Sequence, residues 1–136
     1  MNVVGLGTHI VECLRIAQLI QRHQDLFLTR IYTTREIEYC SARNAATQHY
    51  AACWAAKEAI LKALGTGWSR GIQWTDIEVL RGEGGGGAVA AVLAGSALEI
   101  ARELGIDEIL VSLSHCRTHA TAFALAVRHE AAAEDE

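Results

Sequence analysis

A long helix between residues 45 and 64 constrains the fold of this chain more than any other feature of its sequence. The segment is rich in alanine, leucine, lysine and glutamate, which are strong helix formers. Gly65-Thr66-Gly67 follows it, and glycine just beyond a helical segment is a typical helix stop. The sequence therefore predicts one long helix against which the other elements pack.

The remaining segments predict shorter elements of both kinds. Short apolar runs predict strands at residues 2–6, 72–81, 88–94, 109–113 and 120–127. Apolar residues at helical spacing predict further helices at residues 10–24, 24–32 and 96–104, and a capping box, Thr33-x-x-Glu36, opens another through Cys40. The glycine run 84–87 predicts a hairpin with a flexible tip. Because the elements do not alternate strictly and the hairpins favour antiparallel pairing, the predicted class is α+β.

Gly5 and Gly7 come directly after the first predicted strand. They match the first two glycines of G-x-G-x-x-G, but the third position is Ile10 and no parallel crossover follows, so a dinucleotide-binding fold is excluded. We interpret the two glycines as a sharp turn. The turn would place Thr8, as N-cap, and His9 at the start of the next helix, where anions are favoured.

Length and composition predict one compact domain. At 136 residues the chain fits a single domain, expected at residues 1–128, with a frayed acidic tail at 129–136. The net charge of −4 argues against non-specific binding of nucleic acid. No apolar run approaches the roughly 20 residues of a membrane-spanning helix. The four cysteines form no C-x-x-C pair and are interpreted as free buried thiols, so we expect a cytoplasmic protein without a zinc site.

Several polar residues stand at positions that could carry chemistry. Glu58 and Lys62 are four apart on the long helix and share one face. The same spacing is typical of an ordinary surface ion pair, and spacing does not decide between the two interpretations. His115 ends a predicted strand, where binding residues and exposed histidines both occur. Arg15 and Arg22 share a helix face, which by itself predicts only a solvated surface.

Five segments, in order and at matching spacing, resemble the holo-[acyl carrier protein] synthases, which are small trimeric phosphopantetheinyl transferases. The segments are GLGTHIVECLRI from Gly5, RIYTTREIEYC from Arg30, WAAKEAILKALGTG from Trp54, GIQWTDIEV from Gly71 and VSLSH from Val111. The resemblance implies the phosphopantetheinyl transferase fold, a small antiparallel sheet packed with a long helix, in a homotrimer. It also implies transfer of 4′-phosphopantetheine from coenzyme A to a serine of an apo acyl carrier protein, with release of adenosine 3′,5′-bisphosphate.

The resemblance also assigns roles to individual residues. Glu58 stands at the position of a metal ligand and catalytic residue, and Lys62 at that of a catalytic residue that contacts the phosphates. Arg43 and His115 match positions that hold coenzyme A, and Gly65 lets the backbone approach it closely. The metal implied is Mg²⁺, which prefers hard oxygen ligands and bridges phosphate oxygens.

Arg15 and Arg22 match the basic helix face that docks the carrier protein, whereas two other positions depart from the family pattern. His9 stands where the family has a metal-binding aspartate, and imidazole suits Mn²⁺ or another transition metal better than Mg²⁺. Cys53 replaces an arginine expected to contact a coenzyme A phosphate. These departures leave two alternatives: a paralogue that binds coenzyme A or carrier protein without transfer, and a purely structural subunit.

Overall fold

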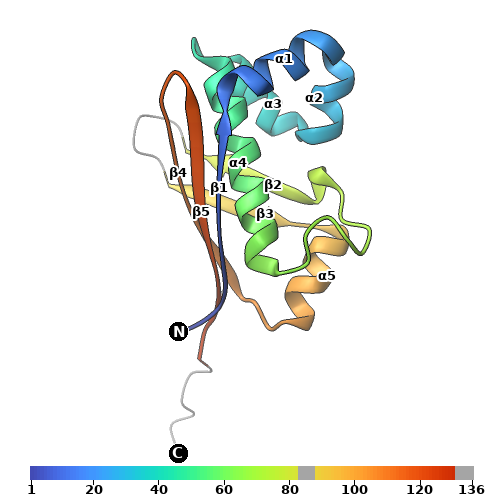
Figure 1. Cartoon of the computed structure of the whole chain (residues 1–136). Coiled ribbons are helices and arrows are strands. Elements are labelled where there is room, and N and C mark those ends of the chain that lie inside the picture. The colour runs from blue at the N-terminus through green and yellow to red at the C-terminus, as the bar shows by residue number, and fades with distance from the viewer. Residues whose placement is uncertain (83–87, 131–136) are drawn as a thin grey trace, which may run out of the picture.

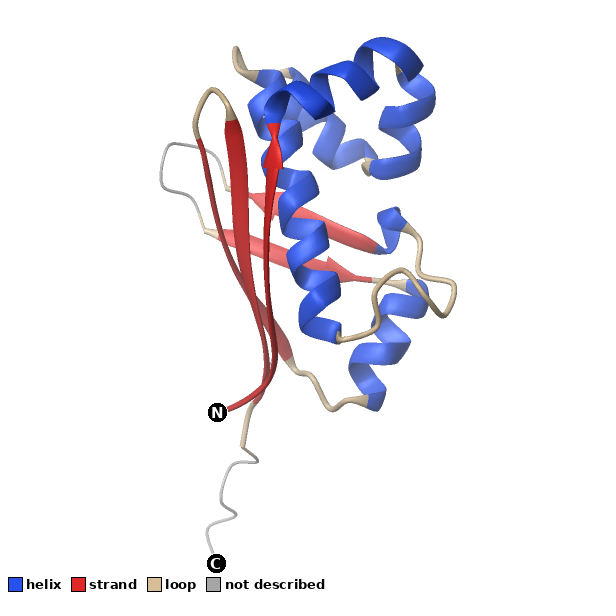
Figure 2. Ribbon diagram, in the orientation of Figure 1, coloured by secondary structure: helices blue, strands red, loops and turns tan. Residues whose placement is uncertain are grey.

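The computed structural model describes residues 1–82 and 88–130, which form an α+β fold (Figures 1 and 2). Five antiparallel strands form one sheet in the order β1-β5-β4-β3-β2. Helices α1 to α3 gather at one end of α4, and α5 lies toward its other end (Figure 1). The elements are β1 (Asn2–Glu12), α1 (Cys13–His23), α2 (Asp25–Ile31), α3 (Thr34–Ser41), α4 (Ala46–Leu64), β2 (Ile77–Arg81), β3 (Val89–Leu93), α5 (Gly95–Glu103), β4 (Glu108–His115) and β5 (His119–Arg128).

Small residues let α4 lie very close to β1 and β5. The alanines of β5 that face the core, at positions 120, 122, 124 and 126, are buried, as are most alanines of α4. A Cβ atom added at Gly5 would overlap the carbonyl oxygen of Ala63, and one at Gly7 would overlap that of Ala59. The two glycines therefore serve close helix–strand packing, and their interpretation as a turn is wrong.

The first strand is longer than predicted because it pairs with a distant partner. β1 runs through Glu12 and pairs with β5 from Asn2↔Arg128 to Glu12↔His119. The Thr8 hydroxyl donates to the carbonyl of Ala122 across this pair, so Thr8 is not a helix cap. Helix α1 begins only at Cys13, with Glu12 at the N-cap position. His9 accordingly lies inside a strand and not at a helix N-terminus.

The local signals for helix ends are confirmed. Thr33 and Glu36 form both hydrogen bonds of a capping box at α3. Gly65 ends α4 in the left-handed region, with φ of 78°, a conformation in which glycine avoids strain. The strand predicted from residue 72 starts later, at Ile77, because residues 74–76 form a 3₁₀ turn.

Two predictions concern the ends of the described chain. The predicted glycine-rich tip at 84–87 lies outside the described residues, although β2 and β3 on either side pair as expected. At the start of the tail expected from residue 129, the His129 backbone donates to Asp107 and its ring contacts Glu108. Residues 131–136 lie outside the described range. No helix within 1–82 and 88–130 has the length and hydropathy to cross a membrane.

A buried ion pair joins α3, α4 and β2 in the core. The side chains of Lys57 and Glu36 are fully buried, with Nζ 2.7 Å from Oε1. The Lys57 ammonium also donates to the carbonyls of Ile31 and Trp74. Glu36 accepts hydrogen bonds from the backbone N–H groups of Thr33 and Val79 and from the thiol of Cys53. Both charges are therefore fully hydrogen-bonded, as burial requires.

The cysteines are only partly as predicted. All four are free; three are buried, and Cys116 is exposed. Burial, with the neighbouring Glu36 carboxylate, raises the pKa of Cys53, so its thiol stays protonated and donates to Glu36. Cys53 therefore belongs to the core network and does not face solvent.

Candidate active site

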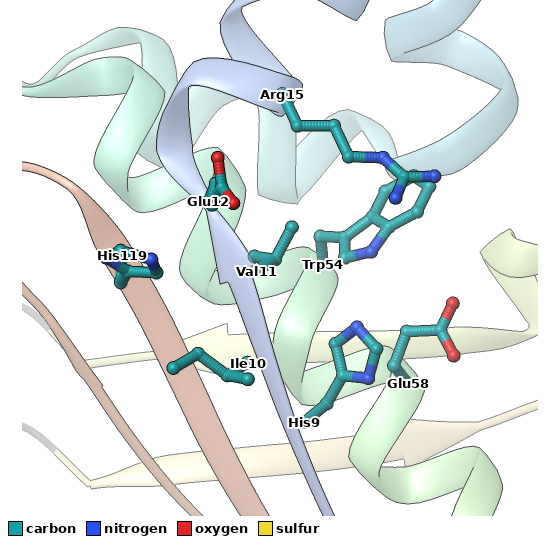
Figure 3. A pocket seen from close by; sticks show the side chains of 8 residues that line it. All are labelled: His9, Ile10, Val11, Glu12, Arg15, Trp54, Glu58 and His119. Atoms are coloured by element: carbon teal, nitrogen blue, oxygen red, sulfur yellow. The ribbon is translucent and has the colours of Figure 1, made fainter.

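A pocket of about 430 Å³ opens between β1, α1 and α4, and it contains several of the sequence-predicted residues. Figure 3 shows His9, Glu58 and Arg15 among its lining side chains. His9 and Ile10 leave β1 on opposite sides, as successive strand residues do. The longer β1 thus directs His9 toward the α4 residue Glu58.

Lys62 connects α4 to β1 at the edge of this pocket. Its Nζ lies 2.8 Å from the carbonyl oxygen of Thr8 and 3.3 Å from Nδ1 of His9. Burial lowers the pKa of His9; nearby Lys62 and Arg15 also lower it, while Glu58 opposes the shift. The ring is therefore neutral at pH 7, and Nδ1 can accept a hydrogen bond from the lysine. We call His9, Glu58 and Lys62 the pocket cluster.

Glu58 is held by a tryptophan that the sequence did not single out. Trp68 Nε1 donates to Glu58 Oε1 at 3.4 Å. The Trp68 ring packs on Trp74, with 3.9 Å between centroids, and Trp74 packs on Trp54 at 4.3 Å. No ion pair joins Glu58 to Lys62 in the described part of the chain. The two residues therefore have separate partners, which argues against an ordinary surface ion pair.

Arg15 and Arg22 both lie on the exposed side of α1, but they differ in position. Arg15 lines the pocket, whereas Arg22 borders a separate depression with Gln18 and Gln21. Seven residues of helix separate the two arginines by about 10 Å. The large apolar side chain of Leu14, 64% exposed, lies beside Arg15 in the sequence. This surface combines positive charge with exposed apolar area.

Arg43 and His115 lie outside the pocket, in a second group of residues near the start of α4. His115 Nδ1 is 3.1 Å from Oε1 of Gln48, and its ring centroid is 4.9 Å from that of His49. Arg43 lies over the Tyr39 ring, 3.3 Å from its centroid. Nine residues of helix separate His49 from Glu58, about 14 Å along the axis. Within the described chain, Arg43 and His115 therefore lie apart from the pocket cluster.

Gly65, the last predicted ligand-contacting residue, lies at the opposite end of α4 from Arg43. No atom of the described chain lies within 4 Å of a Cβ built there. Its positive φ explains the glycine, and the open space leaves its backbone accessible.

The pocket offers few protein ligands for a metal. Within residues 1–82 and 88–130 no three His, Cys, Asp or Glu side chains come together as a metal site. Mg²⁺ is commonly held by one or two carboxylates, waters and substrate phosphates, and Glu58 fits that pattern with one carboxylate. His9 fits it poorly, since imidazole is not a preferred Mg²⁺ ligand and its Nδ1 faces Lys62. The residues fit a cation shared with a phosphate ligand.

Comparison with known proteins decides the family. The sequence model of the 4′-phosphopantetheinyl transferase superfamily matches residues 5–127. Holo-[acyl-carrier-protein] synthase of Rhodopirellula baltica is 46% identical over 123 residues, covering 90% of this chain and 96% of the relative. That of Moorella thermoacetica is 47% identical over 119 residues, covering 88% and 90%. The chain belongs to the holo-[acyl-carrier-protein] synthase family.

Solved structures of holo-[acyl-carrier-protein] synthases share the fold. The crystal structure from Neisseria meningitidis matches with a TM-score of 0.83 and 27% identity, covering 93% of this chain and 100% of that one. The Helicobacter pylori synthase in complex with coenzyme A matches with a TM-score of 0.77 and 26% identity, covering 90% and 99%. The predicted family and α+β fold are confirmed.

Proposed function

We propose that this protein transfers 4′-phosphopantetheine from coenzyme A to a serine of an apo acyl carrier protein. The observation that carries the proposal is the pocket cluster: a carboxylate and a neutral imidazole line one pocket, and a lysine contacts that imidazole, in a chain from the synthase family. The relatives are named for this activity, and several related structures contain coenzyme A.

The pocket cluster can perform the chemistry of the transfer. A serine oxygen bonds to the phosphorus next to the pantetheine, while the bond from that phosphorus to the bridging oxygen breaks. The Lys62 ammonium has three donor hydrogens. Two are directed to the Thr8 carbonyl oxygen and His9 Nδ1 on β1, so one remains for the phosphate oxygens. It offsets the charge that leaves with adenosine 3′,5′-bisphosphate. Glu58 lies in the pocket as the base that helps to remove the serine proton.

We propose that Glu58 also holds a divalent cation, Mg²⁺ or, because of His9, Mn²⁺. Such a cation would neutralise charge on the phosphates of coenzyme A when bound. Trp68 supports this role, because its hydrogen bond to one Glu58 oxygen fixes the carboxylate and leaves the other oxygen free for a ligand.

The exposed face of α1 is the proposed docking surface for the carrier protein. Arg15 stands at the rim of the pocket, and Arg22 lies two turns further along the same helix. An acidic partner docked along these arginines would have its serine near Glu58. Leu14 adds exposed apolar area to the same helix, and complementary charge would orient the partner.

We propose a homotrimer in which two protomers share each site. On the sheet face opposite α4, the large apolar side chains of Leu6, Ile10, Leu110 and Phe123 remain 38–65% exposed. Contiguous exposed apolar area is typical of an interface. A shared site would also explain why Arg43 and His115 lie about 14 Å along α4 from Glu58 within one protomer.

We further propose that the protein acts in the cytoplasm, where free cysteines such as these four stay reduced. No observation favours a paralogue that binds without transfer, or a purely structural subunit. Glu58 lines the pocket and Lys62 contacts His9, which also lines it. Cys53, where the family has an arginine, donates to Glu36 in the core network.

The decisive experiment measures the mass of an apo carrier protein after incubation with coenzyme A, Mg²⁺ or Mn²⁺, and the protein. We expect the wild-type chain to add one phosphopantetheine, and Glu58→Ala to slow transfer by about 100-fold or more, as for loss of a catalytic base. Exposed Arg102→Gln is the matched control. No mass addition by the wild-type chain with any carrier tested would refute the transferase.

Co-expression of two inactive variants tests the shared site. An oligomer made only of Glu58→Ala chains lacks Glu58 in every site. An oligomer made only of His115→Ala chains lacks His115 in every site. If a site joins Glu58 of one protomer to His115 of its neighbour, random mixed trimers recover up to about a quarter of wild-type activity. Activity no higher than that of the separate variants would show that one protomer supplies both residues.

A further inference from the structure

The His9 ring lies between the α4 lysine and the open pocket. Lys62 Nζ is 3.3 Å from Nδ1 of His9 and 2.8 Å from the carbonyl oxygen of Thr8. An ammonium group has only donors, so Nδ1 is the acceptor in this contact and carries no hydrogen. A neutral imidazole has one N–H, which the hydrogen-bond network therefore assigns to Nε2. The lysine thus fixes the tautomer of His9.

Regular structure holds the contact between His9 and Lys62 on both sides. His9 pairs with Ala122 between β1 and β5, and the Thr121 hydroxyl donates to the His9 carbonyl at 3.0 Å. A Cβ atom added at Gly7 would lie only 2.8 Å from Cβ of Lys62, so glycine lets α4 bring the lysine up to β1. A strand and a packed helix, and not a loop, therefore position the ring.

The Nε2–H group is available to a ligand in the pocket. Among the hydrogen bonds of residues 1–82 and 88–130, the only one made by the His9 ring is the contact with Lys62. Figure 3 shows the second ring nitrogen directed into the pocket, toward the Trp54 indole. The carboxylate of Glu58, which lines the same pocket, accepts instead from Trp68. An anion bound in the pocket would complete this donor.

We infer that His9 donates its Nε2–H to an oxygen of the phosphoryl group that is transferred, and so acts as a catalytic hydrogen-bond donor and not as a metal ligand. The inference rests on the proposed function. The phosphoryl oxygens are negatively charged while the serine oxygen attacks and the bond to the bridging oxygen breaks, and a donor already in place stabilises that charge. The imidazole keeps its proton throughout, and the serine proton still goes to Glu58. The Lys62 charge polarises the ring and strengthens the donor.

The same tautomer argues against metal binding by the imidazole. A ring nitrogen binds a metal through an unprotonated lone pair, and the only such nitrogen of His9 faces the Lys62 ammonium. The cation proposed on Glu58 then takes its other ligands from waters and phosphate oxygens. Position 9 therefore contributes to the same charge stabilisation as a metal-binding carboxylate would, but through a hydrogen bond.

The test compares His9→Gln with His9→Met in Mg²⁺ and in Mn²⁺. The glutamine amide offers an N–H at about the reach of Nε2 and an oxygen that can accept from Lys62, whereas methionine offers neither. We expect His9→Met to slow transfer by about 100-fold, the loss of one preorganised donor, and His9→Gln by less than about tenfold. Urea denaturation confirms that both variants remain folded. Each loss should agree within about twofold between the two metals, because the donor does not touch the cation.

Two further readouts do not depend on turnover. Long-range ¹H–¹⁵N NMR spectra show which ring nitrogen carries the proton, and we expect Nε2–H in the free chain and a downfield shift of this proton when coenzyme A binds. Mn²⁺ alone, followed by electron paramagnetic resonance, should bind wild type and His9→Met with dissociation constants within about twofold of each other.

Three results would overturn the inference: an Nδ1–H tautomer, a loss of Mn²⁺ affinity of about tenfold or more in His9→Met, or a preference for Mn²⁺ that disappears with His9. The proposed function fails separately. No transfer by the wild-type chain, with the Nε2–H signal still shifted by coenzyme A, would refute the transferase and leave the hydrogen bond. Transfer with an unchanged Nε2–H signal would overturn the inference and leave the transferase.

Discussion

Helix α4 carries two lysines, each near a glutamate, and the two sets behave in opposite ways. Lys57 is fully buried, and all its donors are bonded to Glu36 and to backbone carbonyls. Lys62, five residues further on, is exposed; it contacts β1 and forms no ion pair with Glu58 in the described chain. The buried set is complete within the protein, whereas Lys62 and Glu58 each keep hydrogen-bonding capacity that the described chain does not use. Hydrogen-bond satisfaction, more than spacing, separates structural from functional charge.

The largest expected effect is on the buried set. Lys57→Met keeps the length of the side chain but leaves Glu36 as an uncompensated buried charge, so we expect a loss of about 3–5 kcal/mol in the free energy of unfolding. Urea denaturation measures it. Lys62→Met is the matched control on the same helix and should change stability by less than about 0.5 kcal/mol. Equal stability of the two variants would contradict the distinction between the buried Lys57 and the exposed Lys62.

The second prediction concerns the rate of transfer, which should depend on Lys62 and not on Lys57. Lys62→Met should slow phosphopantetheine transfer by about 100-fold, because it removes a charge that stabilises the phosphates in the transition state. The folded fraction of Lys57→Met should transfer at close to the wild-type rate. A Lys62→Met chain that keeps the wild-type rate would remove this residue from the pocket cluster.

The smallest effect concerns the third member of the pocket cluster. His9→Asp supplies a second hard oxygen ligand beside Glu58, so we expect about a three- to tenfold gain in transfer with Mg²⁺. Asparagine has nearly the same size as aspartate but no charge, so His9→Asn serves as the control. The ratio of rates in Mg²⁺ and Mn²⁺ is the measurement. A gain with asparagine, or none with aspartate, would show that His9 does not occupy a ligand position.

The helix ends at Thr33 and Gly65 were found correctly from the sequence because their signals lie inside a single helical turn. The capping box at Thr33 and the left-handed Gly65 are such signals, since the atoms that they join are at most four residues apart. The errors at Gly5, Gly7 and Thr8 have the opposite origin. Glycine in a turn and glycine under a helix look the same in sequence, and only the approach of α4 distinguishes them.

The residues of the candidate site also divide into those that the sequence identified and those that only the structure revealed. Spacing placed Glu58 and Lys62 on one face of a helix, and family resemblance attached the chemistry to them. Trp68 carried no signal, because it reaches its partner across the fold: it contacts Glu58 from the loop after α4. Lys57 stands beside Glu58 in the sequence, yet one residue of helical rotation turns it into the core.

The sequence by itself determined the family, the α+β class and the long helix with Glu58 and Lys62, since these depend on local propensity and ordered motifs. The tertiary structure alone decided which lysine is buried, that His9 points from a strand toward Glu58, and that Arg43 and His115 lie apart from the pocket cluster. The physical reason is that burial and strand pairing arise between residues as distant as Asn2 and Arg128, and their free energies exceed local preferences.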